Sequence, residues 1–139
     1  MTDAVHDQPM VDPEQFRTIL GHFATGVTVV TAMVDGKPVG MAANAFSSVS
    51  LDPPLVLFCA AKSSSTWSRI HDTGAFAVNI LGAHQAELCR NFATAPAEER
   101  FADVAFQTAA TGSPILSDSV AFVDCHIDAE HDAGDHTIV

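Results

Sequence analysis

One stretch of the chain, residues 39–66, does most to limit the folds that are open to it. A run of mostly small residues, 39–50, is followed by a turn at Asp52-Pro53-Pro54 and then by an apolar run, 55–61. Because the second run is apolar on both faces, it predicts a central strand that faces the first segment across the turn. A hydroxyl-rich loop, 62–66, closes the unit. The stretch therefore predicts a domain built from strands and hairpins.

Strand signals also lie on both sides of this stretch. Residues 27–34 are β-branched and alternate, and Asp35-Gly36 predicts a tight turn into a strand at 37–45. A further strand is expected at 75–81, and residues 120–130 alternate between apolar and polar. A turn at 132–135 leads into a last strand, 136–139, in which the chain stops. That ending predicts a truncated sequence and an unpaired strand edge.

Helices are expected at the periphery. Asp12 predicts an N-cap with Pro13 at the first helical position, and apolar residues at helical spacing predict a helix that ends near Gly26. Shorter helices are expected after residue 66, at 83–92 and at 97–101. Residues 1–11 show no period and predict a flexible tail, which leaves one domain over 12–139. The fold class expected from these elements is mainly β: a small antiparallel barrel of six or seven strands with two or three short peripheral helices.

Composition limits the class of protein and of partner. A chain of 139 residues that is 47% apolar predicts one soluble domain. The net charge of −11, with only six Lys and Arg, argues against nucleic-acid binding. Neither a membrane-spanning run nor a signal peptide is visible in the sequence, so a cytoplasmic protein is expected. Cys59, Cys89 and Cys125 are odd in number and lack metal-ligand spacing, which predicts buried free thiols.

The residues alone leave two kinds of site open. The 62–66 loop, between a strand and a helix N-terminus, can bind a phosphate through free N–H groups, although ordinary helix capping explains the same residues. His126, Asp128 and Glu130 alternate on one predicted strand face and can approach a divalent ion, but a solvated face is the simpler interpretation. No Gly-x-Ser-x-Gly elbow, Rossmann fingerprint or Walker A loop occurs, which argues against a serine hydrolase, a Rossmann cofactor and a nucleoside triphosphate.

Four motifs occur in order along nearly the whole chain. They are Phe-Arg-x-x-x-Gly-x-Phe-x-Thr-Gly-Val-Thr-Val-Val-Thr at 16–31, the stretch 40–54 that ends Phe-x-Ser-Val-Ser-Leu-Asp-Pro-Pro, Phe-Ala-Val-Asn-Ile-Leu at 76–81, and Gly-Asp-His at 134–136. Together they resemble the flavin reductase family, which has the FMN-binding split-barrel fold and serves two-component flavin monooxygenases. The resemblance implies an antiparallel split barrel.

The same resemblance implies a set of cofactor-binding residues. They are Met41, Ala42, Asn44, Ala45, Ser50, Cys59, Ala60, Lys62, Ser63, Ser65, Thr66, Asn91 and Phe92. The members at 62–66 would hold the flavin phosphate, and those at 41–45 would lie under the flavin rings. His136 is the implied catalytic residue and would stand beside the nicotinamide, with a structural role in closing the 132–135 turn as the alternative. Family members often carry Thr and Ser where this chain has Ala42 and Ala45, and they continue past Gly-Asp-His through further strands.

The function that the resemblance implies is that of a flavin reductase of the FMN or riboflavin type. Such a protein transfers hydride from NADH or NADPH to FMN or FAD and supplies the reduced flavin to a separate monooxygenase. It is usually a homodimer. Two alternatives remain: a flavin-binding electron-transfer module without turnover, and a metal-dependent enzyme that uses the polar cluster at 126–136 and loses function with a chelator.

Overall fold

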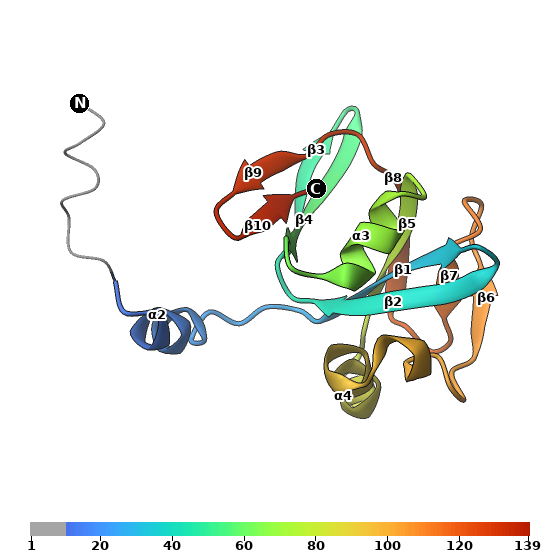
Figure 1. The fold of residues 1–139 in the computed structure, drawn as a ribbon, viewed down its shortest axis with the longest axis horizontal. Helices are drawn as coiled ribbons and strands as arrows, with labels where there is room; N and C mark the ends of the chain where they lie inside the picture. The colour runs from blue at the N-terminus through green and yellow to red at the C-terminus, as the bar shows by residue number, and fades with distance from the viewer. Residues whose placement is uncertain (1–10) are drawn as a thin grey trace.

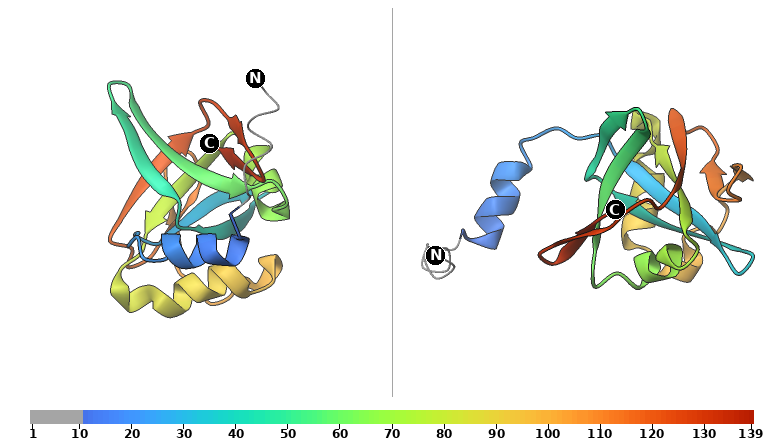
Figure 2. Two further views of the ribbon diagram at one scale, coloured as in Figure 1. Left: turned by 90° about the vertical axis from the view of Figure 1, so that its left-hand side faces the viewer. Right: turned by 90° about the horizontal axis from the view of Figure 1, so that it is seen from above.

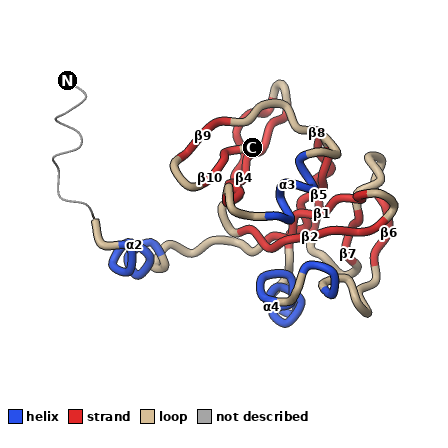
Figure 3. Tube along the Cα trace, in the orientation of Figure 1, coloured by secondary structure: helices blue, strands red, loops and turns tan. Residues whose placement is uncertain are grey.

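The computed structural model describes residues 11–139, and these form a mainly β structure in which every paired strand is antiparallel (Figure 1, Figure 3). Two four-stranded sheets and one two-stranded sheet are present in these residues. The tail expected at 1–11 lies outside the described residues except for Val11, which is exposed. The predicted fold class is confirmed.

The first sheet has the order β2-β1-β5-β8. Its strands are β1 (Thr28–Val34), β2 (Lys37–Ala43), β5 (Ala75–Ile80) and β8 (Ala121–His126). Asp35 and Gly36 join β1 to β2 with φ of 51° and 77°, and two successive positive φ values are the signature of the tight hairpin turn that the sequence predicts. β8 is shorter than the predicted strand at 120–130, because it ends at His126.

The second sheet has the order β3-β4-β10-β9. Its strands are β3 (Phe46–Leu51), β4 (Pro54–Ala61), β9 (His131–Ala133) and β10 (His136–Ile138). The apolar strand β4 is paired on both sides, as its sequence predicts. The unpaired edge expected at 136–139 is wrong, because β10 pairs with both β4 and β9, and Val139 exchanges backbone hydrogen bonds of 2.9 and 3.2 Å with Phe58.

The third sheet pairs β6 (Phe106–Thr108) with β7 (Pro114–Leu116), and the sequence did not predict either strand. With them, the described residues hold ten strands rather than six or seven. β6 and β7 are each only three residues long, which is too short for an alternation of apolar and polar residues to be recognised. A buried side chain of β5, Asn79, holds β7 in place by accepting a hydrogen bond of 2.8 Å from the Leu116 N–H.

The helices α2 (Pro13–Leu20), α3 (Ser65–His71) and α4 (Ala86–Thr94) and the 3₁₀ turns η1 (Ala83–Gln85) and η2 (Ala97–Glu99) lie outside the sheets. α2 begins at the predicted cap, where the Asp12 carboxylate accepts from the Glu14 N–H, but it ends at Leu20 rather than near Gly26. It also stands away from the sheets (Figure 2), and none of its residues is buried. Its apolar side chains are each more than half exposed: Phe16, Ile19, Leu20 and the following Phe23.

Two apolar clusters pack on opposite faces of β1, because successive side chains of a strand alternate between faces. Val30 faces α3 and β4, where Phe58 makes edge-to-face contacts with Trp67 and Phe76 at 5.2 and 5.1 Å between ring centroids. Val29 faces α4 and β7. The three cysteines are free thiols, as predicted, but each is half-buried rather than buried. No helix within residues 11–139 has the length and apolar character needed to cross a membrane.

An ion pair between His71 and Glu130 links α3 to the segment before β9, and we expect it to make stability depend on pH. The His71 ring also contacts the Asp72 carboxylate at 3.3 Å, and this hydrogen bond, followed by the contact of 3.0 Å with Glu130, raises the pKa of His71. A raised pKa in the folded state contributes stability that is fully present below the unfolded pKa of about 6.5 and is lost as the pH rises through the folded value. The effect is at most about 1 kcal/mol, because both groups are partly solvated.

The measurement is thermal unfolding of the wild type and of His71→Gln at pH 5.5 and at pH 8.5. The unfolding temperature of the wild type should exceed that of His71→Gln by more at pH 5.5 than at pH 8.5. His22→Gln is the matched control, because His22 makes no ion pair with the described residues. An equal difference at both pH values would show that protonated His71 adds nothing.

Candidate functional site

The loop between β4 and α3 presents backbone donors that have no partner among residues 11–139. Ser64 caps α3 by accepting from the Trp67 N–H at 3.1 Å, whereas the N–H groups of Ser63, Ser65 and Thr66 bond to none of the described residues. Ser63 and Ser65 are exposed and Thr66 is mostly buried. Free N–H groups at the positive end of a helix favour an anion. Capping is therefore shown for Ser64, and the neighbouring residues of the loop keep donors that an anion could use.

The β9–β10 hairpin lies beside this loop. The Lys62 ammonium contacts the Asp132 carboxylate at 3.0 Å, and its backbone N–H donates to the Asp135 carbonyl at 3.0 Å. His136 pairs with Ala61 across the two strands. Its Nδ1 lies 2.8 Å from the Asp135 carboxylate, and this hydrogen bond lowers the pKa of Asp135. The structure thus brings His136 next to the hydroxyl-rich loop, which lies 70–74 residues earlier in the chain.

The residues predicted to lie under the flavin rings follow the outer edge of the first sheet. Met41 and Ala42 are half-buried in β2, which is the terminal strand of that sheet and also contacts α3 and β4. Asn44 and Ala45 are exposed in the link to β3. The Ala45 carbonyl accepts from the Cys59 N–H at 3.1 Å, which joins this link to β4. Segments 41–45, 59–66 and 136 therefore meet in one region.

Four predicted residues are not brought to that region as exposed groups. Ala60 is fully buried, and Phe92 is 1% exposed within the cluster that also holds Val29. Asn91 donates to the Arg100 carbonyl at 2.7 Å and so fixes the turn after α4. Ser50 lies on β3 and lines a different cavity. The positions of Ala60, Asn91 and Phe92 fit a supporting role, whereas Ser50 faces that cavity.

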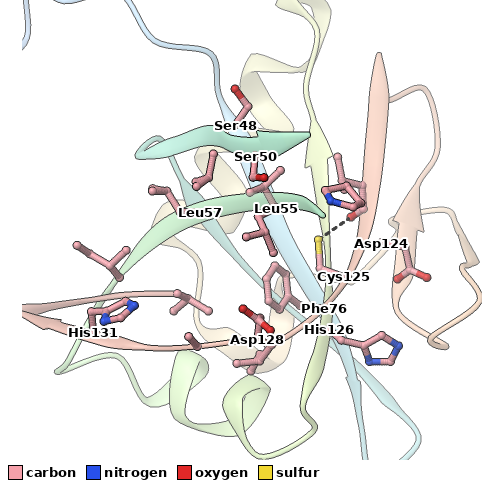
Figure 4. Close-up of a pocket in the computed structure, with 18 residues that line it drawn as sticks. Ser48, Ser50, Leu55, Leu57, Phe76, Asp124, Cys125, His126, Asp128 and His131 are labelled. Carbon is pink, nitrogen blue, oxygen red and sulfur yellow. Dashed lines mark hydrogen bonds between the residues drawn. The ribbon is translucent and has the colours of Figure 1, made fainter. Parts of the chain in front are cut away.

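That cavity has a volume of about 680 Å³ and lies between the β3–β4 hairpin and β8 (Figure 4). Its walls are mainly apolar and include Leu55, Leu57 and Phe76. It shares only Ser50 with the predicted cofactor residues. Burial, with the Asp124 carboxylate adding to it, raises the pKa of the lining Cys125 to about 11, so the thiol stays protonated at neutral pH and is a poor nucleophile.

The geometry that a metal site at 126–130 requires is not present. Since β8 ends at His126, the residues at 126, 128 and 130 do not share one continuous strand face, and Glu130 instead contacts His71 at 3.0 Å. Within residues 11–139, no three His, Cys, Asp or Glu side chains are grouped closely enough to hold a metal ion. The predicted common face is therefore wrong.

Arg100, which was not predicted from the sequence, contacts both β2 and the start of α3. Its Nη1 donates to the Gly40 carbonyl at 3.0 Å and to the Thr66 hydroxyl at 3.3 Å. In sequence it follows Glu98 and Glu99 and looks like an ordinary surface charge. No local pattern connects it with β2 or α3, because both contacts are long-range.

Gly40 leaves β2 no room for a side chain, and we expect Gly40→Ala to destabilise the protein by about 1–3 kcal/mol. A Cβ at this position would lie 2.7 Å from Phe92 Cε1 and 3.1 Å from Phe101 Cε2. The two rings pack edge to face at 5.0 Å, and Phe92 is fully buried, so neither can move freely. Urea unfolding measures the change, and Gly26→Ala is the control because a Cβ there meets nothing within 4 Å. Equal losses in both variants would exclude the proposed ring contact as the cause.

Comparison with known proteins shows to which family the chain belongs. The family model for the flavin reductase like domain matches residues 20–139. The reductase subunit HsaB of a flavin-dependent monooxygenase from Rhodococcus jostii is 44% identical over 92% of this chain and 65% of its own length. A flavin reductase from Pseudomonas putida is 45% identical over 93% of this chain and 76% of its own.

A solved structure is also similar over most of the chain. The NADH:FAD oxidoreductase SgcE6 from Streptomyces globisporus superposes with a TM-score of 0.85 at 40% identity, covering 94% of this chain and 81% of that one. The chain thus spans about two thirds to four fifths of the length of these relatives. The predicted family is confirmed: the chain belongs to the flavin reductase-like domain family.

Proposed function

We propose that this chain is a flavin reductase that transfers hydride from NADH or NADPH to FMN or FAD and supplies reduced flavin to a separate monooxygenase. The observation that carries the proposal is the meeting of three segments, 41–45, 59–66 and 136, at a loop with free N–H donors. A relative named as the reductase subunit of a flavin-dependent monooxygenase, at 44% identity, and one named as a flavin reductase, at 45% identity, support it.

The residues present fit a flavin phosphate. The free N–H groups and the hydroxyls of Ser63 and Ser65 are donors, and Lys62 adds a positive charge. We propose that these residues and Thr66 hold the phosphate, and that the backbone at 41–45 together with Cys59 supports the rings. A bound flavin itself supplies the capacity to accept hydride. The protein has to stack the two cofactors and exclude water, which requires no strong acid–base pair.

His136 has a geometry suited to the nicotinamide. Its Nδ1 is engaged by Asp135, which leaves Nε2 without a partner among the described residues. An imidazole held in this way can donate to or accept from a carboxamide through its other nitrogen. We propose that this nitrogen orients the nicotinamide. Both flavins carry a phosphate at the same position relative to the rings, so the loop serves FMN and FAD alike.

We further propose that the active form is a homodimer in which the apolar face of α2 packs against a second copy. The support is that Phe16, Ile19 and Leu20, on a helix with no buried residue, and Phe23, which follows the helix, are 53–76% exposed. Apolar faces of this kind are normally covered. Sedimentation equilibrium should give twice the chain mass of 14.6 kDa, and Leu20→Lys should weaken the association. A wild-type monomer at micromolar concentration would contradict the dimer.

NADH and NADPH oxidation, followed by absorbance with and without added FMN or FAD, tests the function. Flavin-dependent, saturable oxidation is expected, and comparison of the four cofactor pairs gives the specificity. Flavin binding without turnover would favour the electron-transfer module, and inhibition by a chelator without any flavin dependence would favour the metal enzyme. Absence of flavin binding would contradict the proposal outright.

A further inference from the structure

Arg100 joins α3, β2 and the segment after α4 through one side chain. Its Nε donates to the Ala95 carbonyl at 2.9 Å, after α4, while Nη1 donates to Gly40 in β2 and to Thr66 in α3. The planar guanidinium fixes the directions of its donors, so these contacts set the spacing of β2 and the loop. A Lys ammonium on a flexible stem cannot reproduce that fork.

None of the described residues neutralises the charge of Arg100. No carboxylate within residues 11–139 lies within 4.0 Å of its guanidinium, although the chain carries 17 Asp and Glu. Nη2 bonds to none of the described residues and is not enclosed. A partly buried cation without a counter-ion is costly unless a ligand supplies the negative charge. The unpaired guanidinium therefore points to an anion in this region.

The contact with Thr66 also orients a hydroxyl. Because the Thr66 oxygen accepts from Arg100 at 3.3 Å, its own proton is free for another acceptor. Thr66 is in the first turn of α3, next to the free N–H groups of the loop. Arg100 thus turns an otherwise rotatable group into a donor of fixed direction.

We propose that Arg100 is a positioning residue of the flavin site, which orients the Thr66 hydroxyl toward the flavin phosphate and leaves its own charge available there. The proposal rests on the proposed function and adds to it a residue that discriminates phosphorylated flavin from riboflavin. Arg100 should therefore contribute to the binding of the flavin phosphate and not to the binding of the flavin rings.

The test compares the dissociation constants of FMN and riboflavin, measured by fluorescence quenching. Arg100→Met should weaken FMN about tenfold, as expected for loss of a charge-assisted hydrogen bond, and riboflavin by less than about threefold. Arg100→Lys should recover part of the FMN affinity. Arg90→Met is the matched control, because Arg90 is exposed on α4 and its side chain makes no hydrogen bond with the described residues. Circular dichroism checks the fold of each variant.

A double-mutant cycle separates positioning from general support. If Arg100 acts through Thr66, Arg100→Met should cost less FMN affinity in a Thr66→Val background than in the wild type. If Arg100→Met does not fold, the FMN and riboflavin affinities of Thr66→Val and Arg100→Lys are measured instead. Equal losses for both flavins, strict additivity, or wild-type affinity in Arg100→Met would each overturn the assignment. A wild type that binds neither flavin would instead overturn the proposed function, and with it the site that Arg100 serves.

Discussion

Replacement of Asn79 by leucine is expected to lower the free energy of unfolding by about 3–5 kcal/mol. Asn79 is fully buried in β5, and its Nδ2 donates to the Val29 carbonyl at 3.1 Å and to the Thr31 hydroxyl at 3.0 Å. Its Oδ1 accepts from the Leu116 N–H. Leucine has a similar volume but removes all three hydrogen bonds inside the core, at about 1–3 kcal/mol for each lost partner. The network also holds β7 against the first sheet, since Thr31 donates to the Pro114 carbonyl at 2.6 Å.

Urea unfolding, read by fluorescence of the single tryptophan, measures this loss. Asn79→Leu should lower the urea concentration at the midpoint of unfolding. The dependence of the free energy of unfolding on urea concentration should not change, because the surface exposed on unfolding is nearly the same. Asn44→Leu is the control, since Asn44 is exposed and its side chain bonds to none of the described residues. It should stay within about 0.5 kcal/mol of the wild type. A loss below about 1 kcal/mol in Asn79→Leu would show that the network is not needed for stability.

Asn79 also shows what a sequence of this kind reveals and what it does not. The strand at 75–81 follows from local pattern, as do the Asp35-Gly36 turn and the Asp12 cap, because each depends on residues a few positions apart. The partners of the Asn79 side chain, in contrast, lie 37, 48 and 50 residues away. Neither spacing nor periodicity encodes such contacts, so the β6–β7 sheet that they hold was missed.

The candidate site likewise contains residues that local sequence pattern reveals and residues whose role depends on distant contacts. The loop at 62–66 was found because its hydroxyls and the helix cap are local, and the resemblance supplied His136 on a distant strand. Phe92 and Ala60 follow the same family pattern, yet both are buried in the core, where burial depends on the whole fold. The end of β8 at His126 likewise depends on a distant partner, because His126 pairs with Ala75, the first residue of β5. Arg100 gave no signal, because its role depends on contacts 34 and 60 residues away.

Replacement of Ser65 by aspartate is expected to raise the dissociation constant of FMN about 10- to 100-fold and to leave that of riboflavin nearly unchanged. The new carboxylate would stand in the proposed phosphate loop, where two like charges about 4 Å apart repel by about 1–4 kcal/mol. Ser65 is exposed and is the first residue of α3. Aspartate in the first turn of a helix is stabilising, so misfolding cannot explain a loss of binding.

Ser117→Asp provides the matched control, because it adds the same charge to a chain at −11 but on an exposed residue beyond β7. If FMN affinity falls only with Ser65→Asp, the effect is local to the loop and not a result of net charge. Riboflavin then separates the two parts of the flavin, since it has the rings but no phosphate. Equal weakening of both flavins would mean that residue 65 contacts the rings, and undisturbed FMN binding would remove the phosphate from this loop. If FMN binding is undisturbed, the Arg100 guanidinium, which has no counter-ion among the described residues, would need a different anion. The expected result would instead mean that the Arg100 charge and the neutral donors of the 62–66 loop act on the same phosphate.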